Sequence, residues 1–273
     1  MLRTRVITAV ALMPLVLGML FFAPRWLWAL FALLIGLLGS WEWSRLCKLD
    51  TLLQRAYLVF SGSIGVLLVS LYLVSPMRLY PVVAQALLWT AAVFWIAAVP
   101  VWLKMRLQPA PWVLALAGWL VIWPFWIALV DLRDRNTLVL LGAALIVWIA
   151  DIAAYFAGRQ FGKRKLAPAI SPNKSWEGVY GALAGVAIYG LALLAWSTGG
   201  AITPWWGVFL AALALLTAVS VLGDLFESWM KRGAGVKDSS NLLPGHGGVL
   251  DRIDALTSTL PVAALLVSLK GTL

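Results

Sequence analysis

Charged residues and cysteine are both scarce in this sequence of 273 residues. Only 12% of the residues are charged and 63% are hydrophobic, with a mean hydropathy of +0.93. A soluble domain carries about 25% charged residues, so this composition excludes a soluble fold. Cys47 is the only cysteine, which excludes an intrachain disulfide, a metal cluster of thiolates and a CxxC redox pair.

Long hydrophobic runs fill most of the chain. Runs of about 18 or more residues recur, each long enough for a helix to cross a hydrocarbon core about 30 Å thick. We therefore predict an all-α, polytopic membrane protein with about nine transmembrane helices, broken at polar residues and at Pro and Gly clusters. The expected ranges are 6–22, 26–41, 57–74, 82–101, 112–130, 137–157, 178–196, 205–222 and 255–269.

Basic residues are unevenly divided between the two sides of this predicted bundle. If the N-terminus is cytosolic, sixteen Lys and Arg fall on the cytosolic side and five on the other. Such a bias predicts a cytosolic N-terminus and an external C-terminus. The expected location is a bacterial-type inner (plasma) membrane. The five outer residues are Arg25, Arg78, Arg133, Arg135 and Lys270.

Two of the predicted cytosolic loops, 158–177 and 223–254, are long and rich in polar residues. We expect residues 136–273 to form a catalytic transmembrane region with these loops, and residues 1–135 to be a scaffold that could pair subunits. The net charge is +10, but no soluble domain is present to carry a nucleic-acid-binding face. Anionic lipid or nucleotide phosphate is therefore the expected partner, and nucleic acid is not.

Asp151 lies inside an otherwise apolar run, about two turns from its cytosolic end. A carboxylate there costs a few kcal/mol on insertion scales, so it needs a partner or a water-filled cavity. Tyr155 and Arg159 follow on the same helical face. Asp151 is thus either a functional residue or one half of a structural ion pair with Arg159 or another helix.

The loop after this helix combines hydroxyl groups, an ammonium group and backbone donors. Its segment 171–175 contains Ser171 and Lys174 and stands directly before the next helix. This combination suits phosphate oxygens, which bind readily at a helix start. The alternative is an ordinary basic cluster at the membrane edge.

Carboxylates recur at helical spacing in the segment 223–254. If residues 223–232 are helical, Asp224, Glu227, Ser228 and Lys231 share one face, and Asp251 and Asp254 share another. Three carboxylates that met at one point would repel one another without a cation. Oxygen ligands favour a hard ion such as Mg²⁺.

Glycines and basic residues lie between those carboxylates. Glycine backbones allow N–H groups to approach an anion, and basic side chains add positive charge, as a polyphosphate site requires. The alternative is a solvated loop of helix breakers and surface charges, and His246 is either a loop hydrogen-bonding group or a catalytic one. The residues concerned are Gly233, Gly235, Gly245, Gly247, Gly248, Lys231, Arg232, Lys237 and Arg252.

These residues resemble a known signature, that of the phosphatidate cytidylyltransferases (CDP-diacylglycerol synthases). The stretch from Asp151 to Gly178 is also similar to that family, so the resemblance covers roughly residues 145–254, and the first 140 residues match only in hydropathy. Every fixed position of the signature is present in Ser228-x2-Lys231-Arg232-x4-Lys237-Asp238-x5-Pro244-x-His246-Gly247-Gly248-x2-Asp251-Arg252-x-Asp254.

The resemblance implies a reaction in which CTP and phosphatidic acid give CDP-diacylglycerol and pyrophosphate. It also implies a helical membrane protein, often a homodimer in membrane lipid, that uses Mg²⁺ together with K⁺. Expected metal ligands are Asp224, Asp251, Asp254 and Asp151, and the expected catalytic set is Asp224, Asp251, Lys237, Asp238, His246 and Arg252. Expected phosphate-binding residues are Ser171, Lys174, Ser228, Lys231, Arg232, Gly247, Gly248 and Arg159.

Two other classes of function remain to be distinguished. An ion-coupled transporter would spread polar residues through several helices at mid-membrane depth, whereas here they cluster at one side. Another lipid enzyme, such as a polyprenol kinase or a CDP-alcohol phosphotransferase, would also work at the membrane face. The latter is expected to carry an Asp-Gly-x2-Ala-Arg motif, which this sequence lacks.

Overall fold

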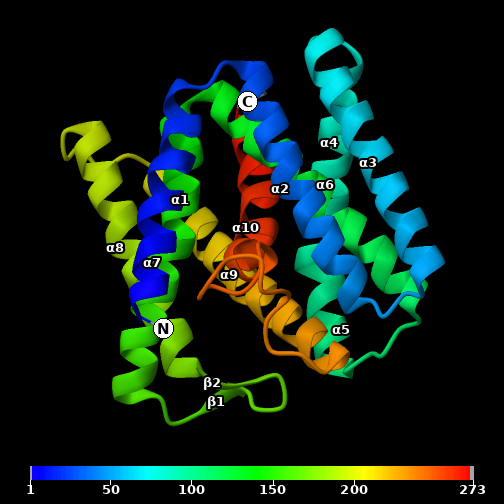
Figure 1. The fold of residues 1–273 in the computed structure, drawn as a ribbon. Coiled ribbons are helices and arrows are strands. Elements are labelled where there is room, and N and C mark those ends of the chain that lie inside the picture. The colour runs from blue at the N-terminus through cyan, green and yellow to red at the C-terminus, as the bar shows by residue number, and fades with distance from the viewer. Residues whose placement is uncertain (1, 271–273) are drawn as a thin grey trace.

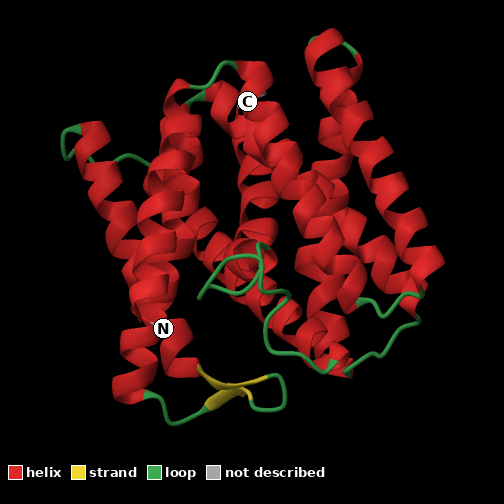
Figure 2. Cartoon of the chain, in the orientation of Figure 1, coloured by secondary structure: helices red, strands yellow, loops and turns green. Residues whose placement is uncertain are grey.

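The computed structural model describes residues 2–270, and they form an almost entirely helical bundle (Figures 1 and 2). A short π-helix, η1, joins α4 to α5 in one continuous segment. Each of the nine predicted helices is present. Their bounds are α1 (Leu2–Phe22), α2 (Arg25–Leu46), α3 (Thr51–Val74), α4 (Leu79–Val93), η1 (Phe94–Ala98), α5 (Val99–Met105), α6 (Pro111–Arg135), α7 (Thr137–Phe161), α8 (Trp176–Thr198), α9 (Trp205–Ala234) and α10 (Leu250–Lys270).

Eight helical segments of the described chain are long and apolar enough to cross a membrane: α2, α3, the α4–α5 segment and α6 to α10. The first helix, α1, adds a shorter apolar stretch, Val6–Phe22. The chain is therefore an integral, polytopic membrane protein. The end of α9 differs most from the prediction, since this helix continues to Ala234, and α3 and α10 begin earlier than predicted, at Thr51 and Leu250. The predicted ranges end at the first polar residues, because the apolar runs end there. The helices continue through these residues because their side chains have partners.

Tryptophans join α2 and α6 at the centre of the bundle. The Trp28 indole N–H donates to the carbonyl of Leu129 (3.0 Å), and the Trp126 indole donates to the carbonyl of Ala29 (3.1 Å). All four residues are buried. Hydrogen bonds of this kind hold helices together where lipid gives no hydrophobic drive for association.

Small residues let α7 and α8 approach each other closely. A Cβ atom on Gly185 would stand 2.7 Å from the Cβ of Ala153, and one on Gly178 would stand 3.1 Å from the carbonyl oxygen of Ala154. Glycine at these positions is therefore a packing requirement, as is common between transmembrane helices.

Replacing Gly185 by leucine should separate α7 from α8 and destabilise the protein by about 1–3 kcal/mol, the usual cost of overpacking. The measurement is the thermal unfolding midpoint in detergent. Gly207→Leu is the control, because a Cβ at Gly207 meets nothing within 4 Å. Equal midpoints for the two variants would show that the close approach does not matter.

A small hairpin and a long loop lie at the same end of the bundle. The hairpin follows α7 and pairs β1 (Lys165–Ala167) with β2 (Ser171–Ser175) in antiparallel fashion. The α9–α10 loop, residues 235–249, turns back from the end of α9 to the start of α10 (Figure 1). We call this end, which also holds the α2–α3 and α5–α6 connections, the hairpin end.

Candidate active site

Lys231 on α9 binds two carboxylates at once. Its Nζ atom lies 2.7 Å from Glu227 Oε2, one helical turn earlier, and 2.6 Å from Asp251 Oδ1 on α10. The three side chains are 12%, 5% and 4% exposed, so this is a buried ion-paired group. The prediction that Glu227 and Lys231 share a helical face is confirmed.

The second carboxylate oxygen of Asp251 holds the α9–α10 loop. Asp251 Oδ2 accepts from the Ser239 N–H (2.8 Å), the Ser239 hydroxyl (2.9 Å) and the Gly248 N–H (2.8 Å). Gly247 has a φ of +83°, and a Cβ there would stand 2.7 Å from Asp251 Oδ2. The glycine pair therefore allows backbone to approach an anion, as expected, but this anion is the chain's own carboxylate.

Asp224 joins α9 to the hairpin. Its Oδ2 forms an ion pair with Nζ of Lys174 on β2, and its Oδ1 accepts from the Ser228 hydroxyl (3.3 Å). The hairpin is held in turn by Glu177, which accepts from the N–H groups of Lys163 and Arg164. The two polar loops of the sequence thus meet at one place, as predicted.

Two further carboxylates, Asp254 and Asp151, lie within electrostatic range of this group. Asp254 interacts with Asp224 and Asp151, and Asp151 also interacts with Lys174. The cluster of five carboxylates (Asp151, Asp224, Glu227, Asp251 and Asp254) and two ammonium groups (Lys174 and Lys231), which we call the carboxylate–lysine cluster, has three formal negative charges in excess. A partly buried excess of this kind is costly without a further cation.

The chemistry of the cluster fits a hard cation. Its carboxylates offer only oxygen, the donor that Mg²⁺ prefers. The Oε1 atom of Glu227 is buried and has no hydrogen-bond partner within the described chain. The carboxylates of Asp224 and Asp251 are paired with lysines, and the described residues contain no group of three His, Cys, Asp or Glu placed to hold a metal ion. The metal site therefore stays a prediction.

Several predicted site residues lie around the cluster rather than in it. Lys237, Asp238 and Arg252 are exposed, and Ser171 is half-buried in the hairpin. The Nδ1 atom of His246 is buried without a hydrogen-bond partner in the part of the chain that the structure describes.

Two arginines named as phosphate-binding residues have neutral partners. Arg159 donates to the hydroxyl of Tyr155 (3.3 Å), so the ion pair with Asp151 considered above is not the contact that the structure gives it. Arg232 donates to the carbonyl of Val236 (3.3 Å) and is exposed. Both guanidinium groups thus keep donors available for an anion.

Glu42 on α2 is a member of the site to which the sequence analysis gave no role. It is fully buried, and its Oε2 accepts from the Leu250 N–H (2.7 Å) and the Ser239 hydroxyl (3.0 Å). Its Oε1 accepts from the Ser240 hydroxyl (2.6 Å) and the Val249 N–H (2.9 Å). Glu42 therefore caps the start of α10 and fixes the α9–α10 loop.

The signal that could have revealed Glu42 was present in the sequence. Glu42 stands between Trp41 and Trp43, directly after the predicted helix 26–41. A carboxylate between two tryptophans at the end of a membrane helix needs a partner, which is the argument already applied to Asp151.

Aromatic rings fix the part of α9 that carries Asp224 and Lys231. The Phe226 ring is buried and lies 5.7 Å from Trp95, 5.5 Å from Trp102 and 5.7 Å from Trp229, measured between ring centroids. Pairs at this spacing contribute about 0.5–1.5 kcal/mol each beyond the area they bury. The segments around η1 and α5 thereby hold α9 in place from the side opposite the cluster.

The structure thus describes a polytopic helical membrane protein whose polar centre of carboxylates and ammonium groups lies at one end of the bundle. The sequence matches the model of the Cytidylyltransferase family over residues 3–270. It is 42% identical to the phosphatidate cytidylyltransferase of Pseudomonas aeruginosa over 99% of this chain and 98% of that protein. The chain therefore belongs to the cytidylyltransferase family and is a nucleotidyltransferase, as the signature predicted.

Two other relatives with the same name agree with this assignment. Identity to the phosphatidate cytidylyltransferase of Haemophilus influenzae is 36% over 96% of both chains. The protein of that name from Staphylococcus aureus is 42% identical over 137 residues, half of this chain. The full-length matches include the first 140 residues, where the sequence analysis found similarity only in hydropathy.

Proposed function

We propose that this chain transfers a cytidylyl group from CTP to phosphatidic acid, giving CDP-diacylglycerol and pyrophosphate for phospholipid synthesis. The observation that carries this proposal is the carboxylate–lysine cluster, which joins α9, α10 and the hairpin in a chain of the cytidylyltransferase family. Its full-length relatives bear the name phosphatidate cytidylyltransferase.

The chemical step is an in-line substitution. A phosphate oxygen of the lipid attacks the α-phosphorus of CTP, a new P–O bond forms, and the bond from that phosphorus to the β-phosphate oxygen breaks. Pyrophosphate leaves with the electron pair. The lipid phosphate is already anionic at neutral pH, so no protein nucleophile is required, and the main obstacle is repulsion between two polyanions.

The chain's own cations address that repulsion. Lys174 and Lys231 stand in the cluster. Lys237 and Arg252 are exposed, and we assign them, with these two lysines, to the triphosphate and the departing pyrophosphate. Mg²⁺, with K⁺ as a second ion, supplies further charge neutralisation when bound. The residues that would hold these ions are Asp224, Asp251, Asp254 and Asp151.

The location of the site suits a lipid substrate. The diacyl tail can remain in the bilayer while the headgroup reaches the polar cluster at the hairpin end. We infer that this end faces the cytosol of a bacterial inner membrane, because the predicted cytosolic side carries sixteen of the 21 Lys and Arg. Membrane lipid and a second copy of the chain are the proposed partners, and helices within residues 1–135 are the proposed dimer contacts.

The direct test is an assay of pyrophosphate release by the purified protein. Release should require CTP, phosphatidic acid and Mg²⁺ together, and CDP-diacylglycerol should form in equal amount. Parallel incubation with ATP tests the kinase alternative, which predicts ADP and a phosphorylated lipid. Transfer of the ATP γ-phosphate without any pyrophosphate from CTP would reject the proposed reaction.

A further inference from the structure

A cavity of about 750 Å³ lies against the face of α9 that points away from the carboxylate–lysine cluster. Trp229, Met230 and Arg232 line it, whereas Lys231, between them in sequence, points to Asp251. A helix turns by about 100° per residue, so neighbours on both sides of Lys231 can face the other way. None of the carboxylates of the cluster lines the cavity, which makes it a second site.

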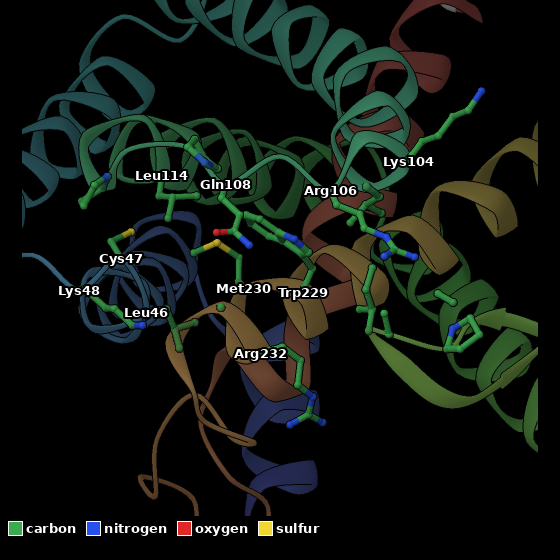
Figure 3. A pocket seen from close by; sticks show the side chains of 18 of the residues that line it. Leu46, Cys47, Lys48, Lys104, Arg106, Gln108, Leu114, Trp229, Met230 and Arg232 are labelled. Carbon is green, nitrogen blue, oxygen red and sulfur yellow. The ribbon is translucent and has the colours of Figure 1, made fainter.

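The walls of this cavity come from four separate parts of the chain at the hairpin end. They are the end of α2, the α5–α6 connection, the end of α9 and the turn of the hairpin. Figure 3 shows Met230, Trp229 and Gln108 in the middle, with Lys48 on one side and Arg106 on the other. A volume of this size lies within the range of about 300–1,000 Å³ that small-molecule sites occupy.

The charged residues of the lining all have the same sign. They are Lys48, Lys104, Arg106 and Arg232, and the lining includes no aspartate or glutamate. All four are exposed, so their donors are accessible to a ligand. Four cations around a partly apolar wall suit an anion with several acceptor oxygens, and phosphate is the common one at a membrane edge.

Backbone conformation provides an independent argument. Within the described chain, the non-glycine residues with positive φ are Lys48 (φ 55°) and Arg106 (φ 50°), and both line this cavity. Each follows the end of a helix, where glycine is the usual residue in the left-handed conformation. A cation near a helix carboxyl end gains some dipole energy, but this is smaller than the cost of the left-handed conformation. The presence of lysine and arginine at these two strained positions therefore points to a use for their charge.

We propose that this cavity binds a phosphate-bearing ligand through Lys48, Lys104, Arg106 and Arg232. Two sources of that chemistry reach the hairpin end: a nucleotide triphosphate from water and the headgroup of a phosphatidate. The choice of CTP and phosphatidate as ligands rests on the proposed function. The inference that the cavity binds phosphate rests only on the residues that line it. A binding measurement therefore tests the site even if the protein catalyses another reaction.

The test variant is the double substitution Lys48→Gly/Arg106→Gly. Glycine relieves the backbone strain, so the thermal unfolding midpoint should stay the same or rise. Binding of radiolabelled CTP and of dioctanoyl phosphatidate is measured for the purified protein in neutral detergent. We expect the dissociation constant of one of them to rise about tenfold or more, the factor for losing charge-assisted hydrogen bonds. If the dissociation constant of CTP rises, the cavity binds the nucleotide. If the dissociation constant of dioctanoyl phosphatidate rises, the cavity binds the lipid headgroup.

The matched control is Arg55→Gln/Lys163→Gln, which removes two exposed cations that do not line the cavity. Unchanged binding of both ligands by the glycine variant, or an equal loss in the control, overturns the proposal. Lys104→Gln is a second variant that leaves both left-handed residues in place. This variant should raise the dissociation constant of the same ligand by about threefold, and an unchanged dissociation constant would count against the site.

Discussion

Asp251→Asn should lower the rate of pyrophosphate release by about a hundredfold or more, the usual scale for removing one group that stabilises charge in a reaction. The substitution keeps the shape of the side chain but removes the charge that pairs with Lys231 at 2.6 Å. It also removes one of the oxygens proposed to hold Mg²⁺. Breaking a buried ion pair by removing one partner costs about 3–5 kcal/mol, so the geometry of α9 against α10 should suffer as well. The measurement is turnover with CTP, phosphatidic acid and Mg²⁺.

Asp134→Asn provides the control for that experiment. Asp134 also forms an ion pair, with Arg25 at 2.6 Å, but it lies at the end of α6 that is remote from the hairpin. Its turnover should stay within about twofold of the unsubstituted protein, since exposed ion pairs contribute little. Near-normal turnover of Asp251→Asn would instead remove Asp251 from the proposed set of metal ligands and catalytic residues.

Glu42→Gln should reduce turnover about tenfold and lower the free energy of unfolding by about 3 kcal/mol, since hydrogen bonds to a charged group contribute about 1.5–3 kcal/mol each. Glutamine matches glutamate in size, but its amide nitrogen cannot accept. Two of the four donors that now face Glu42 would therefore meet an N–H group. The α9–α10 loop would lose part of its anchor, although Glu42 itself is not a ligand of the substrate. Turnover and the thermal unfolding midpoint are the two measurements.

A second substitution, Glu42→Asp, tests whether Glu42 positions the α9–α10 loop. Glu42→Asp keeps both acceptor oxygens on a shorter side chain, so it should recover part of the turnover that Glu42→Gln loses. The effect should fall mainly on kcat, because Glu42 holds the loop that carries proposed catalytic residues and is not itself proposed to bind substrate. Full activity of Glu42→Gln, or a defect confined to unfolding, would contradict the positioning role.

The number and order of the helices could be predicted from the sequence because hydropathy is a local property. Each apolar run must satisfy its backbone hydrogen bonds internally in lipid, and a helix does so without help from other segments. The limits of α9 could not be predicted in this way. Residues 223–234 carry Asp224, Glu227 and Lys231, and they stay helical because each of these side chains has a partner.

The candidate site was predicted in part. The signature named Lys231 and Asp251, the family resemblance added Asp224, and the structure brings all three to one end of the bundle. Which donor binds which carboxylate was not predicted, and Glu42 was missed altogether. Its bond to Ser240 joins residues 198 positions apart, and no periodicity or spacing within one segment reports such a contact.

Two properties follow from the amino-acid sequence alone: the protein is an integral membrane protein of helices, and it carries the cytidylyltransferase signature. Composition and local spacing suffice for both, because the bilayer acts on each segment separately and the signature is contiguous. The anchoring of the α9–α10 loop by Glu42 from the first half of the chain, and the meeting of Lys48 and Arg106 at one cavity, became visible only in the folded protein. Both depend on the folding of distant segments against one another, which brings buried charges to their partners.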